Sequence, residues 1–154
     1  MSVILPGSYD PVTLGHVDII RRAAEKYGEV YAVVFINPEK AYAFSLEDRA
    51  RMLMLATEDI EGCMVSYSTG RVVDYMRDHG IEKIVKGIRS EADVEYEKPQ
   101  EEYNLRHGYP TEYIKAAGEL SGISSTLARE KIKGGESLSG ILPEAVIRYI
   151  SEMD

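Results

Sequence analysis

The hydrophobic pattern of the chain alternates between continuous apolar runs and segments with helical spacing of apolar residues. Short apolar runs rich in β-branched residues, typical of strands buried on both faces, alternate with segments whose apolar residues recur at helical spacing. The expected strands are 3–5, 30–36, 63–67, 84–85 and 111–115. The expected helices are 16–28, 45–59, 72–79, 92–106, 125–133 and 143–150. This alternation predicts the α/β class: a Rossmann-like five-stranded parallel sheet with helices on both faces, in a single domain spanning residues 1–154.

Local signals refine several boundaries of these elements. Ser45 precedes the second helix as an N-cap, with Asp48 at the position that completes a capping box. Gly80 is expected to end the third helix. Pro99 falls within the polar helix 92–106 and is expected to start, bend or interrupt it. Residues 87–89 are expected to form the loop after the fourth strand.

Composition and charge narrow the classes of function. The chain has 18 Lys and Arg against 26 Asp and Glu, and its net charge of −8 argues against a general binder of nucleic acid or of an acidic membrane surface. Its single cysteine, Cys63, lies in an apolar run and is expected to pack in the core, which fits a reducing compartment. No signal peptide is visible and no apolar run approaches the roughly 20 residues of a membrane span, so a cytoplasmic location is expected.

The loop after the first strand carries the first candidate chemistry. Residues 6–13 lead into a helix at Gly15 and His16, and in α/β sheets ligands bind beyond the carboxyl ends of the strands. Free N–H groups at a helix start favour an anion, so a phosphate is the expected ligand. The loop has neither the glycine spacing of a dinucleotide fingerprint nor the Lys-Ser/Thr of a Walker A loop. His16 is either a phosphate ligand or a residue hydrogen-bonded to its own helix start.

Three further clusters of cations or hydroxyls follow expected strands. They are Lys40; Lys86, Gly87 and Arg89; and Ser124, Ser125 and Thr126. The cations suit phosphate, with Arg able to bind it in bidentate fashion, although solvated surface cations are the alternative. Hydroxyl residues are common N-caps, but three in succession exceed what one cap needs, and the remainder could bind a triphosphate at the helix start. No cluster of His, Cys and carboxylates has metal-ligand spacing, so no protein-held metal is expected.

The motifs at these positions resemble a known family. Residues 7–11, Gly-Ser-Tyr-Asp-Pro, with 13–16, Thr-Leu-Gly-His, are similar to nucleotidyltransferases that carry a Thr/His-x-Gly-His motif. Residues 86–97 and the Ile-Ser-Ser-Thr at 123–126 are similar to blocks of the bacterial phosphopantetheine adenylyltransferases. The resemblance extends from residue 3 to about residue 149.

The resemblance implies adenylyl transfer from ATP to 4′-phosphopantetheine, which gives dephospho-coenzyme A and pyrophosphate, with Mg²⁺ on the triphosphate. It implies His16, Lys40 and Arg89 as catalytic residues and Ser8, Lys40, Lys86 and Asn104 as acceptor-binding residues. The implied ATP-binding residues are Gly7, Ser8, Tyr9, His16, Gly87, Arg89, Glu97, Ser124, Ser125 and Thr126. A homohexamer and feedback binding of coenzyme A are carried over as expectations.

The chain departs from this family's pattern at several places. Lys86 stands where Arg is usual, Ala41 replaces a second basic residue, and the segment 98–122 lacks the usual Met-Asn-Arg and the aromatic residue before Ile-Ser-Ser. The tail after residue 123 is closer to nicotinate-nucleotide adenylyltransferases. Two alternatives therefore stay open: an adenylyltransferase or cytidylyltransferase with another acceptor, such as nicotinate mononucleotide, and a catalytically idle nucleotide-binding module.

Overall fold

The central strand β1 (Ser2–Gly7) shows why the chain folds as a layered α/β unit. The computed structural model describes residues 1–153. Successive side chains of a strand point to opposite faces of a sheet, and here Val3, Ile4 and Leu5 are all buried. Val3 and Leu5 belong to the core on one face, and Ile4 belongs to the core on the other. A strand that is apolar on both faces has to be covered from both sides.

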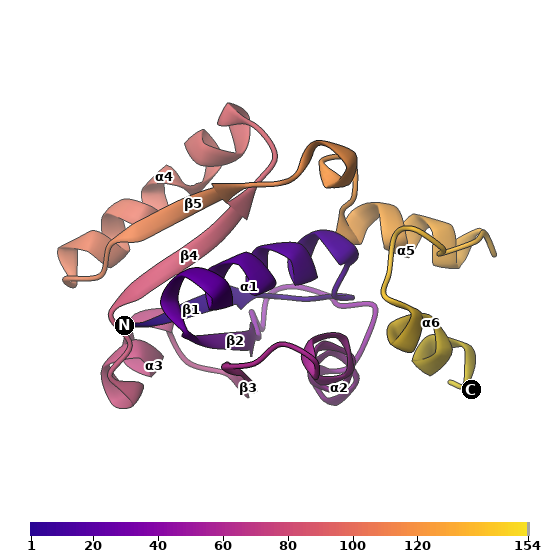
Figure 1. Ribbon diagram of the computed structural model, residues 1–154, viewed down its shortest axis with the longest axis horizontal. Helices are drawn as coiled ribbons and strands as arrows, with labels where there is room; N and C mark the ends of the chain where they lie inside the picture. The colour runs from indigo at the N-terminus through magenta and orange to yellow at the C-terminus, as the bar shows by residue number, and fades with distance from the viewer. Residues whose placement is uncertain (154) are drawn as a thin grey trace.

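Five parallel strands form the sheet in the order β3-β2-β1-β4-β5 (Figure 1). The strands after β1 are β2 (Glu29–Phe35), β3 (Cys63–Ser68), β4 (Lys83–Ile88) and β5 (Thr111–Lys115). The helices are α1 (Leu14–Tyr27), α2 (Leu46–Thr57), α3 (Val72–His79), α4 (Glu91–Arg106), α5 (Ser125–Lys133) and α6 (Glu144–Ser151), with a short 3-10 helix at Gly118–Leu120. The strand order reverses at β1 and β4, where open α/β sheets bind ligands.

The helices divide between the two faces of the sheet. Residues of α1, α2, α5 and α6 join the larger core, and α3 packs against the smaller one through Met76. Figure 1 shows α5 and α6, in orange and yellow, at the end of the sheet where β1 finishes and α1 begins. The predicted Rossmann-like fold with helices on both faces is confirmed.

Most boundaries expected from the sequence are confirmed to within one or two residues. Ser45 caps α2 by accepting a hydrogen bond from the backbone N–H of Asp48, and Gly80 ends α3 in the left-handed conformation. The prediction of a loop at residues 87–89 is wrong, because β4 continues through Ile88. Gly87 and Ile88 pair with Ile114 and Lys115 of β5, a partnership between strands that no local pattern reveals. Cys63 packs against the larger core, as expected.

Pro99 does not interrupt α4, contrary to one of the sequence expectations. The helix is continuous from Glu91 to Arg106 with Pro99 inside it. Proline lacks an N–H and so leaves the carbonyl of Glu95 without its helical partner. Both residues are exposed, so solvent can hydrogen-bond to that carbonyl.

No helix among residues 1–153 is long and apolar enough to cross a membrane.

A polar cluster holds the edge strand β5 to α1 at the end of the sheet away from the first loop. Glu112 pairs with Lys26 at 2.7 Å and with Lys83 at 3.4 Å, and it accepts a hydrogen bond from the Tyr27 hydroxyl. The hydrogen bond from Lys26, followed by the one from Tyr27, holds the pKa of the Glu112 carboxyl below its usual value. The cluster is partly solvated, so its contribution is modest.

We expect Glu112→Gln to lower the free energy of unfolding by about 1 kcal/mol at pH 7. A carboxyl whose pKa is depressed by folding stabilises the protein above its unfolded pKa and loses that effect as the pH falls through the folded pKa. The difference between the wild type and the variant should therefore shrink below about pH 4.5. Urea unfolding at several pH values measures it. Glu25→Gln, at an exposed position of α1, is the control; an equal, pH-independent loss in both variants would contradict this role for Glu112.

Candidate active site

The start of α1 is organised by a reciprocal cap between Thr13 and His16. The Thr13 hydroxyl accepts from the backbone N–H of His16 at 3.3 Å, and His16 Nδ1 accepts from the backbone N–H of Thr13 at 2.9 Å. His16 therefore takes the position that Glu or Gln fills in an ordinary capping box. The interpretation of His16 as a residue bonded to its own helix start is thus confirmed for Nδ1.

The same cap prepares the other ring nitrogen of His16 for a ligand. Because Nδ1 accepts a hydrogen bond from the backbone N–H of Thr13, the neutral ring carries its own hydrogen on Nε2. Burial lowers the pKa of His16 to about 4, so the ring is neutral at physiological pH. The centroids of the Tyr9 and His16 rings lie 5.0 Å apart in an edge-to-face arrangement, which restricts the orientation of the imidazole. Nε2–H is a neutral donor at the mouth of a helix.

The first of three connected hollows lies between α1 and α5 and is here called the α1/α5 cleft. It has a volume of about 350 Å³ and is lined by His16, Gly87, Arg89 and the residues Ser124 and Ser125 that open α5. Two helix starts thus face one cleft, and their free N–H groups favour an anion. The cleft also has an apolar part, formed by Ile19, Ala116, Leu120 and Ile123. A ligand with both an anionic and a flat apolar portion fits this division.

Charged residues just before and within the first turns of α4 line the α1/α5 cleft. Arg89 lies 3.7 Å from the Asp93 carboxylate, which also accepts from the Arg89 backbone N–H at 2.7 Å. Glu97, one turn further along, lines the same cleft. The Arg89 side chain is about half exposed and lines the cleft, and its Nε is the atom that lies beside the Asp93 carboxylate. Its remaining donors are available to a phosphate.

The three hydroxyls at the start of α5 already have partners. Ser124 is the N-cap and accepts from the backbone N–H of Leu127 at 3.0 Å, which confirms the capping interpretation for this residue. Ser125 donates to the carbonyl of Pro11 at 2.8 Å, and Thr126 accepts from Arg129. Ser125 therefore ties α5 to the loop after β1. Thr126 does not line the cleft, so the structure brings only the first two hydroxyls to it.

The second hollow, the α3/α4 pocket, gathers every residue expected to bind the acceptor. Its volume is about 280 Å³, and it lies beyond the ends of β1 and β2. The lining includes Ser8, Lys40, Lys86 and Asn104, together with Val72 of α3 and Gln100 of α4. Lys40 Nζ lies 3.5 Å from the Ser8 hydroxyl, and Asn104 is buried. The four expected acceptor residues come from four separate segments of the chain: the loops after β1 and β2, strand β4 and helix α4.

A third, smaller hollow joins the other two and is here called the junction. It shares His16, Gly87 and Glu97 with the α1/α5 cleft, and it shares Gly7 and Lys86 with the α3/α4 pocket. Lys86 Nζ and Glu97 form an ion pair of 3.6 Å across it. The Tyr9 ring lines the junction, and its hydroxyl donates to the Leu5 carbonyl. Burial of this phenol raises its pKa above the usual value.

Gly87 is required at the junction for packing as well as for access. A Cβ at this position would lie 2.8 Å from Cγ1 of Ile19, so only glycine lets β4 approach α1 this closely. The group that approaches Gly87 this closely is a side chain of α1.

Two buried charged residues organise the site and were missed by the sequence analysis. Asp10 accepts from the backbone N–H groups of Ala43 and Phe44 at 2.8 and 2.9 Å, and so ties the loop after β2 to the loop after β1. Arg49 of α2, only 2% exposed, donates to the carbonyls of Phe44 and Ser8. Arg49 lies three and four residues before the buried Met52 and Leu53, and this spacing was the available signal.

Arg129 completes the connection on the side of α5. Its guanidinium donates to the Asp10 carbonyl at 2.8 Å and lies 3.9 Å from the Asp10 carboxylate.

The three residues expected to be catalytic are divided between two hollows. His16 and Arg89 line the α1/α5 cleft, whereas Lys40 lines the α3/α4 pocket with Ser8. The geometry thus places Lys40 with the expected acceptor residues.

The sequence of this chain is similar to those of known proteins along nearly its whole length. The cytidylyltransferase-like family model matches residues 4–131. A phosphopantetheine adenylyltransferase of Corynebacterium glutamicum (strain R) is 38% identical over 154 residues, which cover 99% of this chain and 96% of that protein. One of Corynebacterium efficiens is also 38% identical, covering 99% of this chain and 97% of its own.

The chain belongs to the phosphopantetheine adenylyltransferase family. The resemblance inferred from residues 7–16, 86–97 and 123–126 is confirmed as membership of the family. Within a phosphopantetheine adenylyltransferase, a nucleotide and an acceptor have to meet at one phosphorus atom. In this chain the α1/α5 cleft and the α3/α4 pocket meet at the Lys86–Glu97 ion pair.

We expect His16 to keep its Nε2–H tautomer, with no protonation of the ring between pH 8 and pH 5.5, because burial lowers its pKa to about 4. Nitrogen-15 correlation spectra of the imidazole measure both properties, and His16→Gln assigns the resonance. Since the unfolded chain takes up a proton near pH 6.5 and the folded one does not, this group removes stability as the pH falls from 6.5 towards 4. A titration midpoint near 6.5 would contradict the assignment.

Proposed function

We propose that this protein transfers the adenylyl group of ATP to 4′-phosphopantetheine, giving dephospho-coenzyme A and pyrophosphate. The observation that carries the proposal is the division of the expected ligand residues between two connected hollows. Of the expected nucleotide residues, six line the α1/α5 cleft: His16, Gly87, Arg89, Glu97, Ser124 and Ser125. Gly7 and Tyr9 line the junction instead, Ser8 lines the α3/α4 pocket, and Thr126 lines none of the three hollows. The expected acceptor residues Ser8, Lys40, Lys86 and Asn104 line the α3/α4 pocket. Such a layout holds two substrates at once and brings their phosphates together at the junction.

The reaction requires positioning and charge stabilisation, with no covalent enzyme intermediate. An oxygen of the acceptor phosphate attacks the α-phosphorus of ATP, a new P–O bond forms, and the bond to the β-phosphate breaks as pyrophosphate leaves. Nε2–H of His16 would donate to the α-phosphate, because His16 lines the cleft and its Nδ1 is already occupied by the backbone N–H of Thr13. Lys86 and Lys40 would hold the acceptor phosphate in line. Fixed donors of this kind stabilise charge that develops in the transition state.

We propose that Mg²⁺ accompanies ATP and is held chiefly by the triphosphate. Among residues 1–153 no group of three His, Cys, Asp or Glu side chains is placed to hold a metal ion. The two carboxylates that line the cleft, Asp93 and Glu97, are each paired with a cation. Mg²⁺ commonly binds through substrate phosphates with one or two protein carboxylates, and this donor set fits that pattern. The ion would neutralise charge on the departing pyrophosphate.

Three further proposals concern the oligomer, feedback by coenzyme A and the cellular compartment. We propose a homo-oligomer, a homohexamer by family membership, in which the exposed apolar side chains Met54 and Tyr67 would be covered. Feedback by coenzyme A, whose pantetheine arm would occupy the α3/α4 pocket, follows from the same site. A single, partly buried cysteine fits the cytoplasm, which we propose as the compartment. Light scattering of the purified chain measures the oligomer directly.

Pyrophosphate release with ATP and Mg²⁺ tests the proposed reaction. We expect release that depends on 4′-phosphopantetheine and falls by roughly 10² to 10³ in kcat for His16→Ala, the usual loss for one transition-state donor. Nicotinate mononucleotide is the competing acceptor. A higher kcat/KM with it would replace the acceptor while leaving adenylyl transfer in place. ATP binding without pyrophosphate release for any acceptor would favour an idle nucleotide-binding module.

Lys86 tests the acceptor side of the site, because it is the cation shared by the α3/α4 pocket and the junction. We expect Lys86→Ala to raise the acceptor KM by roughly tenfold or more, as expected for the loss of a hydrogen bond to a charged group. Lys86→Arg should retain acceptor binding, and the KM for ATP should change little in both variants. Lys98→Ala, which removes an exposed cation of α4 outside these hollows, is the control. An unchanged acceptor KM in Lys86→Ala would place the acceptor phosphate elsewhere.

A further inference from the structure

Helix α4 lies over the site with almost no apolar contact to the rest of the protein. Its only buried residue is Asn104, and its apolar side chains do not gather on one face. Tyr96 is 85% exposed and Leu105 is 58% exposed. A surface helix is ordinarily held in place by a buried apolar stripe, which α4 does not have. Its position therefore depends on polar contacts.

Those polar contacts are spread along the helix, and the first three connect it to the sheet. Asp93 pairs with Arg89 and Glu97 with Lys86, both from the end of β4. Glu101 accepts from the hydroxyl of Tyr113 on β5 at 2.8 Å. These contacts hold the first part of α4, which borders the α1/α5 cleft and the junction.

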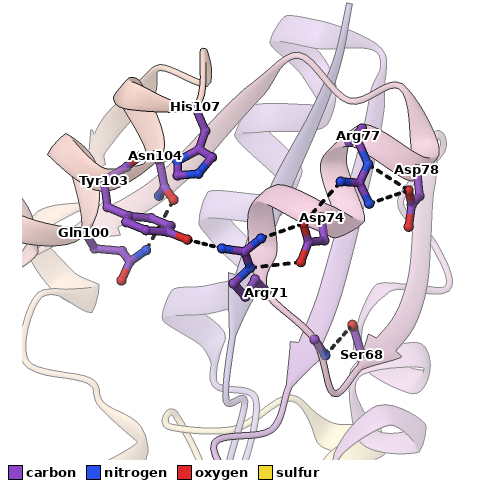
Figure 2. A network of polar contacts seen from close by, with 10 residues as sticks. Ser68, Arg71, Asp74, Arg77, Asp78, Gln100, Tyr103, Asn104 and His107 are labelled. Atoms are coloured by element: carbon purple, nitrogen blue, oxygen red, sulfur yellow. Dashed lines mark hydrogen bonds and ion pairs between the residues drawn. The ribbon is translucent and has the colours of Figure 1, made fainter.

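The last turns of α4 are connected to a different element, helix α3, through Arg71 and Tyr103 (Figure 2). The Arg71 guanidinium donates to the Tyr103 hydroxyl, and on its other edge it binds both carboxylate oxygens of Asp74 at 2.9 and 3.1 Å. Asp74 thus orients the guanidinium towards α4. Within residues 1–153, Arg71–Tyr103 is the side-chain hydrogen bond that spans from α3 to α4.

This hydrogen bond stands beside the α3/α4 pocket and joins two of its walls. Val72, directly after Arg71, lines the pocket from α3, and Gln100 and Asn104, which flank Tyr103 on α4, line it from the other side. The Gln100 amide donates to Asn104 at 3.2 Å, as Figure 2 shows, so these two pocket residues move as a pair with the helix. The width of the pocket between α3 and α4 is therefore set where Arg71 meets Tyr103.

We propose that Arg71 and Tyr103 are positioning residues that hold the α3 and α4 walls of the acceptor pocket at the separation the acceptor requires. Neither residue lines the pocket, so both act through Val72, Gln100 and Asn104. The hydrogen bond fixes the placement of Asn104, whose amide is buried in the wall. The kinetic part of this inference rests on the proposed adenylyl transfer to 4′-phosphopantetheine, whereas the restraint on α4 does not.

Arg71→Ala and Tyr103→Phe test the restraint in the full-length protein. We expect each variant to raise the KM for 4′-phosphopantetheine about fivefold, the change that corresponds to one lost hydrogen bond, with kcat and the KM for ATP within about twofold of wild type. The double variant should be no worse than the single ones, because both remove the same bond. Arg71→Lys should restore part of the acceptor affinity.

Arg77→Ala is the matched control on the same helix. Arg77 pairs with Asp74 and Asp78 but does not reach α4, so its loss removes surface ion pairs of α3 without releasing the pocket wall. We expect the acceptor KM of this variant to match wild type. A rise equal to that of Arg71→Ala would show that general damage to α3 is responsible and would overturn the proposal.

Hydrogen exchange provides a readout that does not depend on activity. Amides of residues 100–106 should exchange faster in Arg71→Ala and Tyr103→Phe than in wild type or Arg77→Ala, while amides of β4 should not change. Unchanged exchange in α4, or additive effects in the double variant, would overturn the proposal even if the enzyme is active. A wild type that releases no pyrophosphate with 4′-phosphopantetheine would overturn the proposed function and the kinetic role together, and exchange would then decide the restraint alone.

Discussion

The site depends on one buried carboxylate, Asp10. A buried charge is costly unless hydrogen bonds and an opposite charge compensate it, and Asp10 obtains both from segments distant in the sequence. The backbone N–H groups of Ala43 and Phe44 bind it from the loop after β2, and Arg129 approaches it from α5. The loop after β1, the loop after β2 and the start of α5 are thereby fixed relative to one another. Both hollows take their walls from these segments.

Around this anchor, local structure and chemistry use the same atoms. The cap between Thr13 and His16 gives α1 a defined start, and it also leaves Nε2–H of His16, a residue that lines the cleft, as a neutral donor. Ser124 similarly caps α5 at the point where the helix start borders the same cleft. For these residues the structural and functional interpretations are not alternatives. A helix start that is well capped holds its remaining N–H groups in fixed positions, as an anion site requires.

The two ligand regions are held with different stiffness. The α1/α5 cleft rests on the central strand and on α1, whose Ile19 and Ile20 belong to the larger core. The outer wall of the α3/α4 pocket is α4, which has polar restraints and a single buried residue. The cleft proposed for the nucleotide is thus backed by the core, whereas the outer wall of the pocket proposed for the acceptor is held by polar contacts.

The sequence by itself determined the order of the elements, the capped starts at Ser45 and Ser124, and the residues able to bind phosphate, because these depend on local periodicity and side-chain chemistry. Only the tertiary structure decided which residues meet. It extended β4 through Gly87 by pairing with β5, carried α4 past Pro99, and brought Lys40 beside Ser8 in a hollow separate from the α1/α5 cleft. It also buried Arg49 against the carbonyl of Ser8, 41 residues away in the chain. Contacts at such separations arise from packing between elements, and no pattern within one segment contains them.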